Sequence, residues 1–346
     1  MATHGQNVFL IGPGYIGLEV IDRLLENGYK VTTLVRREEA AQQLEKRGVN
    51  TVLGTLEDGE KISDQVASHD ITFHTATADD LPSVEAVIRG IDKRASKGKQ
   101  SIYIHTSGCS FLSDDSEGRY KSDVIYTDKD PAPMDARPDS SSHREIDLAI
   151  IRARKRLGTK AKMFLMLPPL IYGANKHGRL SIQIPTMVRF ALKHKYAGYV
   201  GGGEGLWTMI HVSDLSRGYM TILKWLEQSP PEVALEHPYF FCENGEEVSW
   251  KFIASFIGED LFAADKIKSA EPQEIPKEQH DDLFGPYSVV VIGSNARNRA
   301  ERLRELGWKP EHLSVREAFW MEELPILEKE TEEFKGYAKV AASGSG

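Results

Sequence analysis

Three glycines near the N-terminus have the spacing of a loop that binds a pyrophosphate. Gly12, Gly14 and Gly17 follow an apolar run at residues 7–11 and open an amphipathic segment at residues 16–27. Gly12 permits a tight turn, Gly14 lets the backbone approach the anion, and Gly17 lets a helix pack closely on the preceding strand. The position between a first strand and a first helix favours this interpretation over a glycine-rich turn without a ligand.

Two arginines indicate which dinucleotide the loop binds. A fold that prefers NAD(H) places Asp or Glu about twenty residues past the glycines, where the carboxylate accepts hydrogen bonds from the ribose. Here the run at residues 30–35 ends in Arg36 and Arg37, whose guanidinium groups suit a ribose 2′-phosphate. The sequence therefore predicts NADP(H) rather than NAD(H), and the alternative is a solvated charge pair.

His143 and Asp147 have the spacing of an acid/base and the carboxylate that orients it. Both lie in a predicted helix at residues 141–157, whose start is rich in Asp and Ser. Residues four apart share a helical face, so Asp147 could orient His143 for proton transfer near neutral pH. A surface histidine beside a carboxylate is the other interpretation, and both stay open.

Side-chain hydroxyls near two predicted connections are the remaining candidate proton donors: Thr106, Ser107, Ser110, Tyr120 and Tyr126. The first three follow a predicted strand at residues 101–105. The tyrosines lie in a polar loop at residues 113–137, which is long for a connection and could act as a lid. Either tyrosine could supply a phenol proton or simply pack on the loop.

The elements that must position these groups alternate along the first half of the chain. Predicted strands lie at residues 7–11, 30–35, 50–53, 71–74, 101–105 and 162–167. Amphipathic segments such as residues 16–27 and 81–97 lie between them. This alternation predicts an α/β fold of the Rossmann type, a doubly wound parallel sheet with helices on both faces.

Beyond residue 173 the regularity fades, which favours a smaller C-terminal substrate domain. Predicted helices lie at residues 186–194, 214–227 and 249–257, and predicted strands at residues 207–212 and 238–242. An apolar run at residues 288–292 precedes a predicted helical stretch to residue 306. We expect an NADP-binding domain at residues 1–173 with a returning segment 206–245, a substrate domain at 174–205 and 246–335, and a flexible tail at 336–346.

Composition bounds the function and the location. The 346 residues carry a net charge of −8, which gives no reason to expect a nucleic-acid partner. The two cysteines, Cys109 and Cys242, lie in no metal-ligating pattern, and no run approaches the roughly 18 apolar residues of a membrane span. We expect a cytoplasmic protein with a small-molecule substrate, without a metal, a membrane or a nucleic acid.

Taken in order, these motifs resemble the short-chain dehydrogenase/reductase superfamily, in particular its extended and atypical branches, which include epimerase/dehydratase-like and NmrA-like proteins. Further similar segments are residues 54–58, 74–78, 105–108, 168–173, 207–215 and 306–310. The resemblance implies that Asp58 faces the adenine and that residues after the fourth, fifth and sixth strands lie beside the cofactor. The expected cofactor contacts are Gly12, Gly14, Tyr15, Ile16, Gly17, Arg36, Arg37, Asp58, Ala76, Thr77, Thr106, Pro169 and Ile171.

The sequence departs from this family where the catalytic residues are expected. The family uses a Tyr with a Lys four residues later, and here only Tyr172 and Lys176 have that spacing, past the expected helix, which we interpret as coincidence. His143 and Asp147 occupy the expected helix positions instead. The resemblance also places Gly108 where the family carries a catalytic hydroxyl.

The resemblance implies an NADP(H)-dependent oxidoreductase acting on a carbonyl, an imine or an activated alkene of a small or medium organic molecule. Two alternatives stay open: a non-redox isomerase, dehydratase or cyclase that retains the nucleotide fold, and an NmrA-like NADP-sensing binding protein. Relatives of this kind often dimerise through the helices at residues 81–97 and 141–157. The second helix is basic, and both a monomer and a homodimer stay open.

Overall fold

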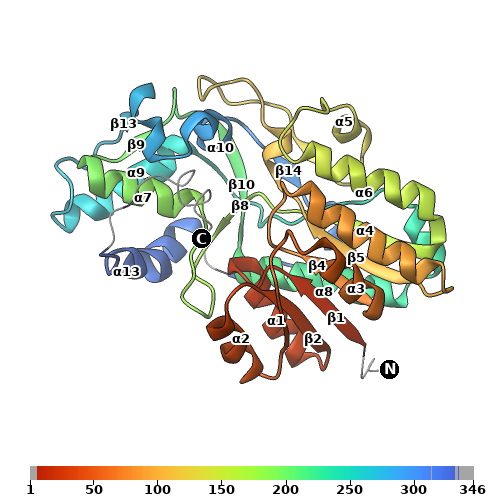
Figure 1. Ribbon diagram of the computed structural model, residues 1–346. Helices are drawn as coiled ribbons and strands as arrows, with labels where there is room; N and C mark the ends of the chain where they lie inside the picture. The colour runs from red at the N-terminus through yellow and green to blue at the C-terminus, as the bar shows by residue number, and fades with distance from the viewer. Residues whose placement is uncertain (1–5, 313, 332–333, 335–346) are drawn as a thin grey trace.

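The larger part of the molecule is built around a seven-stranded parallel sheet (Figure 1). This computed structural model describes residues 6–312, 314–331 and 334, so the tail expected at 336–346 lies outside the described residues. The strands are β1 Asn7–Ile11, β2 Lys30–Val35, β3 Asn50–Leu53, β4 Ile71–His74, β5 Ser101–Thr106, β7 Ala161–Leu167 and β11 Tyr239–Phe241. Their order is β3-β2-β1-β4-β5-β7-β11, and every neighbouring pair is parallel. The predicted Rossmann-like α/β fold is confirmed.

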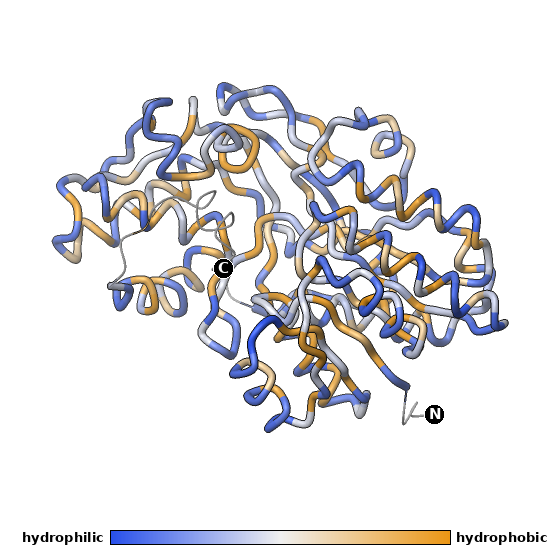
Figure 2. The backbone as a smooth tube through the Cα atoms, viewed as in Figure 1, coloured by the Kyte–Doolittle hydropathy of each residue, from blue (hydrophilic) through white to orange (hydrophobic). Residues whose placement is uncertain are grey.

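Helices cover both faces of this sheet. On one face α3 Gly59–Ser68, α4 Leu81–Ala95 and α6 Arg144–Leu157 lie side by side, and on the other α1 Tyr15–Glu26 packs on α8 Val212–Gln228. The central strands are therefore buried on both sides, which explains why they read as continuous apolar runs. In Figure 2 the tubes of α4 and α6 alternate between hydrophobic and hydrophilic, as expected of helices with one covered face.

The strand order reverses between β1 and β4, and this reversal positions the site. Connections leave β1 and β4 toward opposite faces, so a crevice forms at the carboxyl ends of the strands. The glycine loop follows β1, residues 75–80 follow β4, and residues 107–110 follow β5. Three of the segments expected to hold cofactor or substrate therefore meet at one edge of the sheet.

The smaller part of the molecule is built from short elements of the second half of the chain. Its helices are α7 Gln183–His194, α9 Trp250–Ala263, α10 Ser288–Ile292, α12 Val315–Ala318 and α13 Leu324–Leu327, with η6, a π-helical turn, at Phe319–Glu323. Short sheets join β8 Leu170–Tyr172, β10 Leu206–His211 and β12 Glu247–Ser249, and β9 Gly198–Tyr199 with β13 Gln273–Glu274. The domain boundaries expected from the sequence stay a prediction.

Two expected helices differ from the structure. The helical stretch expected between the apolar run at residues 288–292, which itself forms α10, and residue 306 is wrong for its first half, which contains strand β14 Asn298–Arg299 before the short helix α11 Glu301–Glu305. In addition, α6 begins at Arg144 rather than at residue 141. His143 has φ of 64°, and a left-handed residue cannot continue a right-handed helix.

Candidate functional site

An added side chain would collide with the protein at two of the three glycines of the loop and would meet no described atom at the third. Gly12 has φ of +95°, and a Cβ there would collide with the backbone of Ala76 after β4. At Gly17 an added Cβ would collide with the carbonyl of Gly12 and lie 2.7 Å from Thr75 Oγ1. At Gly14, by contrast, an added Cβ would meet no described heavy atom within 4 Å. The loop is thus packed against its own protein on one side and leaves space at the position where the pyrophosphate is expected.

Side chains from distant segments hold this loop in place. Thr75 Oγ1 donates a hydrogen bond to the Gly12 carbonyl, at 2.8 Å. The Tyr15 hydroxyl donates to the carbonyl oxygens of Tyr172 and Gly173, at 3.0 and 2.6 Å. The phenol of Tyr15 is therefore engaged within the protein, and Thr75, which the sequence motif did not single out, fixes the turn.

The residues expected at the adenosine end lie around the carboxyl ends of β2 and β3. Arg36 and Arg37 follow β2 and are exposed, and Arg37 immediately precedes the first residue of helix α2 Glu38–Glu45. Asp58 turns toward its own loop, where Oδ2 accepts a hydrogen bond from the Thr55 backbone N–H at 2.7 Å. The arginines are therefore accessible from solvent, and one oxygen of the Asp58 carboxylate holds its own loop.

His143 is the centre of a hydrogen-bonded chain at the end of β5. Its Nε2 lies 2.6 Å from Ser110 Oγ, and its Nδ1 lies 2.6 Å from Oδ1 of Asp79. Gly108 leaves room for the ring, since an added Cβ there would lie 3.2 Å from Nε2. The imidazole therefore fills the space beside the position where the resemblance places a catalytic hydroxyl.

Asp147 does not orient His143 by a hydrogen bond, contrary to the expectation from helical spacing. His143 precedes the first helical residue of α6, so the two side chains do not share a regular helical face. The Asp147 Oδ2 instead accepts a hydrogen bond from Ser107 Oγ at 3.0 Å, and both side chains are buried. Burial raises the pKa of Asp147 to about 7, although the nearby His143 and the bond from Ser107 act in the opposite direction.

The other candidate hydroxyls point elsewhere. Thr106 is buried and its hydroxyl pairs with the hydroxyl of Tyr219 on α8, inside the fold. Tyr120 is exposed, and its carbonyl accepts a hydrogen bond from Asn295. Tyr126 lies in β6 Tyr126–Thr127, which pairs with β14. The side-chain partners of His143 are instead Ser110 and Asp79.

The loop at residues 113–137 is tied to the C-terminal segment, which argues against a free lid. Asp128 is buried, and its carboxylate accepts hydrogen bonds from the backbone N–H groups of Phe241, Glu301 and Arg302. Asn295 also donates to Asp114 at 3.0 Å. Opening the loop would leave several of these polar groups without partners, at a cost of about 1–3 kcal/mol for each one that stays buried.

The remaining expected residues have these positions. Thr77 Oγ1 accepts a hydrogen bond from the Asp79 N–H at 3.1 Å, and so shapes the turn that presents Asp79. Ile16 is half-buried, Pro169 is buried beside the end of β7, and Ile171 is half-buried in β8. The Tyr172 hydroxyl accepts a hydrogen bond from Asn244, and Lys176 Nζ pairs with Glu26, which supports the interpretation of the Tyr172–Lys176 spacing as a coincidence.

Two buried histidines, for which the sequence suggested no role, lie near the carboxyl ends of β4 and β5. The rings of His74 and His105 lie 5.1 Å apart, and His105 Nδ1 lies 3.0 Å from the hydroxyl of Tyr103. Burial lowers the pKa of His74 to about 4, and it lowers the pKa of His105 together with the nearby His74 and His143. Both rings are therefore neutral near pH 7 and add polarity without charge.

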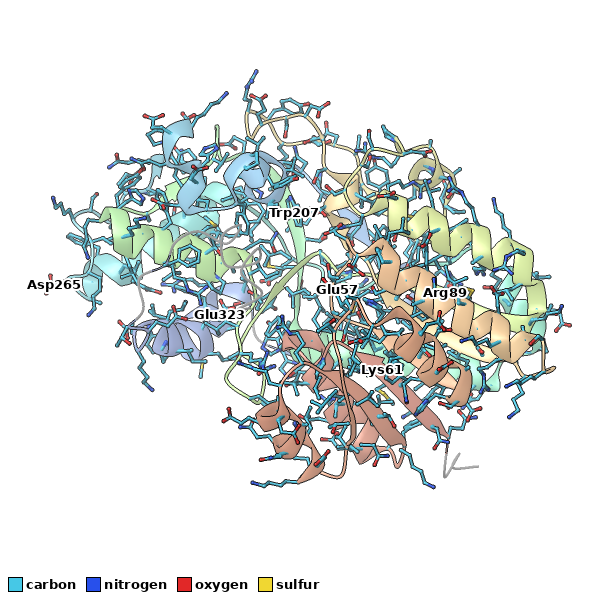
Figure 3. All side chains as sticks on the ribbon, viewed as in Figure 1. Glu57, Lys61, Arg89, Trp207, Asp265 and Glu323 are labelled. Carbon is cyan, nitrogen blue, oxygen red and sulfur yellow. The ribbon has the colours of Figure 1, made fainter. Side chains whose placement is uncertain are left out.

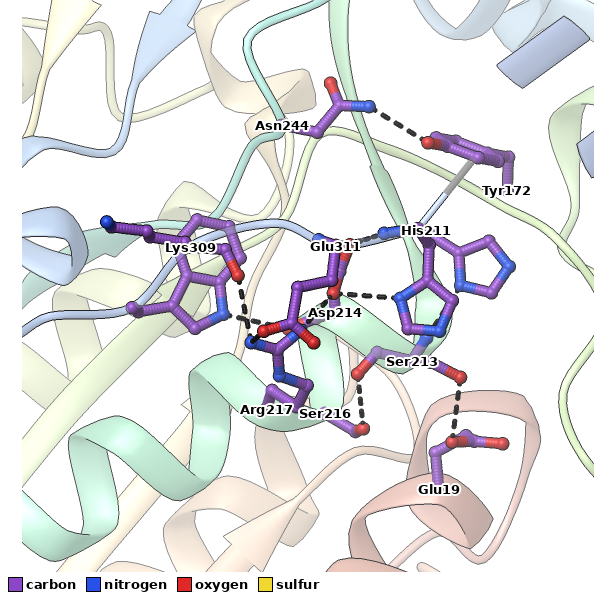
Figure 4. Close-up of polar contacts among 12 residues, drawn as sticks. Glu19, Tyr172, His211, Ser213, Asp214, Ser216, Arg217, Asn244, Lys309 and Glu311 are labelled. Atoms are coloured by element: carbon purple, nitrogen blue, oxygen red, sulfur yellow. Dashed lines mark hydrogen bonds and ion pairs between the residues drawn. The ribbon is translucent and has the colours of Figure 1, made fainter. Parts of the chain in front are cut away.

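A second polar cluster joins the two parts of the molecule (Figure 4). Asp214 accepts hydrogen bonds from the backbone N–H groups of Glu311 and His312, at 2.9 and 3.0 Å, and pairs with Arg217. The rings of His211 and His312 stack at 4.4 Å. The hydrogen bonds of this cluster join protein groups to one another, so we interpret the cluster as a structural contact between the two parts of the molecule.

Comparison with known proteins agrees with this geometry. Residues 12–129 match the sequence model of an NAD(P)H-binding family. An oxidase of an Acremonium species is 28% identical over 329 residues, which cover 88% of this chain and 93% of the oxidase. No group of His, Cys, Asp and Glu within the described ranges could hold a metal ion, and no helix there is long and apolar enough to cross a membrane.

Two solved structures show the same fold. The UDP-glucose 4-epimerase of Thermotoga maritima superposes with a TM-score of 0.65 at 15% identity and covers 94% of this chain and 99% of its own. The yeast methylglyoxal/isovaleraldehyde reductase, complexed with NADPH, superposes with a TM-score of 0.60 at 15% identity, over 93% of this chain and 99% of its own. At such identities the likeness concerns the fold alone.

Proposed function

From the premise that this chain is an NAD(P)H-binding protein with the fold of the extended short-chain dehydrogenase/reductase superfamily, we propose that it is an NADP(H)-dependent oxidoreductase. The observation that carries the proposal is the position of His143. It lies with hydrogen-bonded partners at the carboxyl end of β5, next to the strands whose loops form the glycine cradle. A titratable group there can serve a reaction at the nicotinamide.

The described residues fit NADP(H). Gly14 leaves space for the pyrophosphate, while Gly12 and Gly17 hold the loop tight. Arg36 and Arg37 are exposed where a 2′-phosphate is expected, and guanidinium groups grip phosphate with charge-assisted hydrogen bonds. The bound cofactor would supply a hydride, and the protein would bind, orient and handle the proton.

The altered catalytic residues and the names of the relatives support a substrate class. The solved reductase is named for methylglyoxal and isovaleraldehyde, and the Acremonium relative is named an oxidase. Together with the missing Tyr and Lys pair, these names support a small or medium organic substrate with a carbonyl, imine or activated alkene. A cytoplasmic location and a monomer or homodimer stay predictions, and light scattering against the 38.7 kDa chain mass would decide the latter.

A non-redox reaction is the second candidate, because one structural neighbour is an epimerase and the family's usual acid/base is replaced here. The test is the absorbance of NADPH in the presence of methylglyoxal, isovaleraldehyde, a cyclic imine and an enone. Stoichiometric loss of NADPH with product supports the oxidoreductase. Product without loss of NADPH supports the non-redox enzyme, and NADPH binding without product supports a nucleotide-sensing protein.

A further inference from the structure

We infer that Ser110, His143 and Asp79 form a proton relay, in which the Ser110 hydroxyl meets the reacting atom of the substrate, His143 exchanges its proton, and Asp79 positions His143. The inference deepens the proposed function and rests on it for the identity of the reaction. Only His143 of these three was expected from the sequence as an acid/base with a partner. Asp79 lies 64 residues away from it and Ser110 lies 33 away.

The hydrogen-bond chemistry fixes the tautomer of the neutral His143 ring. A carboxylate only accepts hydrogen bonds, so the Nδ1 of His143, 2.6 Å from Asp79, carries a hydrogen. In the neutral ring Nε2 is then the acceptor, and Ser110 Oγ, at 2.6 Å, donates to it. This is the order of nucleophile or hydroxyl, base and orienting carboxylate that activated side-chain hydroxyls use in unrelated folds.

Three separate parts of the chain are shaped to hold this arrangement. Ser110 lies in the 3-10 turn Cys109–Leu112 after β5, and Asp79 lies between β4 and α4. His143 has φ of 64° immediately before α6, a conformation that non-glycine residues adopt rarely and that clusters at functional sites. Gly108 completes the arrangement, because a side chain there would press on the imidazole.

The alternative pair, Ser107 and Asp147, is too deeply buried to meet a substrate. Ser107 is 4% exposed and Asp147 is fully buried, whereas Ser110 and His143 are both half-buried. Their mutual hydrogen bond also engages the Ser107 hydroxyl. Ser110 is therefore the serine of this segment that can both reach a substrate and exchange a proton with His143.

The relay accounts for the proton that the proposed reaction consumes or releases. In carbonyl reduction the carbon accepts the hydride that NADPH supplies, and the oxygen takes the Ser110 proton. Ser110 then takes the Nε2 proton of the protonated His143, which solvent replaces, so that one hydride and one proton are consumed. In the oxidative direction the alcohol proton passes to Ser110 and then to the neutral Nε2, as the hydride leaves to NADP⁺.

A substrate-free probe tests the activated hydroxyl. A fluorophosphonate reacts when serine Oγ attacks phosphorus, fluoride leaves and the serine proton passes to the base. We expect peptide mass spectrometry to find the adduct on Ser110, and His143→Ala and Asp79→Asn to slow labelling by about tenfold or more. Asp80→Asn is the matched control, because Asp80 Oδ1 only accepts from the Ser83 N–H to cap α4, which Asn does equally well. Absence of label on Ser110, or equal rates in Asp79→Asn and the parent, would overturn the relay.

Steady-state kinetics with methylglyoxal and isovaleraldehyde separate positioning from folding. Ser110→Ala should lower kcat by roughly 10²–10⁴-fold, and Asp79→Asn by about tenfold or more, with KM and NADPH affinity unchanged. A loss confined to KM, or a fall in thermal stability that accounts for the activity, would contradict the assignment. If Ser110 is labelled but the protein consumes no NADPH, the result supports the relay and contradicts the proposed function. Consumption of NADPH without labelling contradicts the relay alone.

Discussion

Position 108 shows how one absent side chain changes the chemistry available at the end of β5. Where the family resemblance expects a hydroxyl, Gly108 has no side chain, and the His143 ring comes to within 3.2 Å of where a Cβ would stand. The hydroxyl function moves two residues on, to Ser110, which has the imidazole as its partner. If His143 replaces the family's Tyr and Lys, the replacement therefore also depends on Gly108, which leaves space for the imidazole ring.

Removal of the imidazole tests whether His143 handles the proton. We expect His143→Ala to lower turnover by roughly 10²–10⁴-fold and to leave NADPH affinity nearly intact, because no expected cofactor contact is removed. Asp147→Asn should do less harm, since Asn resembles the neutral form that burial of Asp147 favours. Steady-state kinetics with nucleotide binding measured in parallel decide this, and activity within about threefold of the parent for His143→Ala would refute it.

Reversal of charge at Arg36 tests the choice of cofactor. In the parent we expect NADPH to bind more tightly than NADH, because the two guanidinium groups can pair with the 2′-phosphate. Arg36→Asp should narrow or reverse that preference, since it replaces a donor by a repelling charge. The measurement is the pair of dissociation constants by calorimetry. Equal constants for the two nucleotides in the unmodified protein would show that the arginines are an ordinary surface pair.

At the scale of elements, the segment that follows β8 is clamped from two sides. The Lys176 N–H donates to Glu19 on α1, at 2.9 Å, and the Gly173 N–H donates to Glu323 on η6, at 3.0 Å. Glu323, labelled in Figure 3, is fully buried, whereas its neighbour Glu322 is partly exposed and pairs with His211. Adjacent glutamates on one turn thus have opposite electrostatic environments.

This contrast predicts opposite pH dependences of stability. Burial raises the pKa of Glu323 from 4.5 to about 8, so between these values the folded state binds the additional proton and the free energy of unfolding falls as pH rises. Glu323→Gln removes this dependence. We therefore expect the Tm of the variant, relative to the parent, to increase between about pH 5 and about pH 8 in thermal melts.

Glu322→Gln provides the matched control. Burial alone would raise the pKa of Glu322, but the hydrogen bond and charge of His211 bring it below its usual value. Its contribution to stability is present above the unfolded pKa and is lost as pH falls, so Glu322→Gln should be most harmful near neutral pH. If the Tm of both variants, relative to the parent, changed with pH in the same direction, the environments assigned to Glu322 and Glu323 would be contradicted.

At the scale of the whole molecule, the two parts interlock around the expected cofactor site. The glycine loop contacts the segment after β8 through Tyr15, and Glu19 on α1 accepts from Ser213 at the start of α8 at 3.3 Å. Elements from the beginning, middle and end of the chain therefore share one joint. A ligand bound at the loop should stabilise both parts together.

Thermal melts with nucleotide test this coupling. A ligand that binds only the folded state stabilises it by about 2.7 kcal/mol at one hundred times its dissociation constant. We expect NADPH to raise the Tm by several degrees within a single transition, and NADH at the same concentration to raise it less. Two transitions of which NADPH moves only one would show that the parts unfold independently.

The sequence by itself determined the features that depend on local geometry. The strand positions follow from short apolar runs with local turn signals, and β1 to β4 begin and end at the predicted residues. The glycine loop could also be predicted from the sequence. Gly12 has a positive φ and Gly17 packs closely on its neighbours, and glycine is the residue type that suits both conditions. Fold class and nucleotide binding follow from these local signals.

Only the tertiary structure decided which side chains act together at the end of β5. Helical spacing predicted Asp147 as the partner of His143, but the left-handed residue at 143 takes its side chain off the helical face, and Asp79 accepts the hydrogen bond instead. Thr106 looked like a candidate by its position, yet it faces Tyr219 inside the fold. Such pairings join segments far apart in sequence, and their geometry depends on how whole elements pack, which no local pattern encodes.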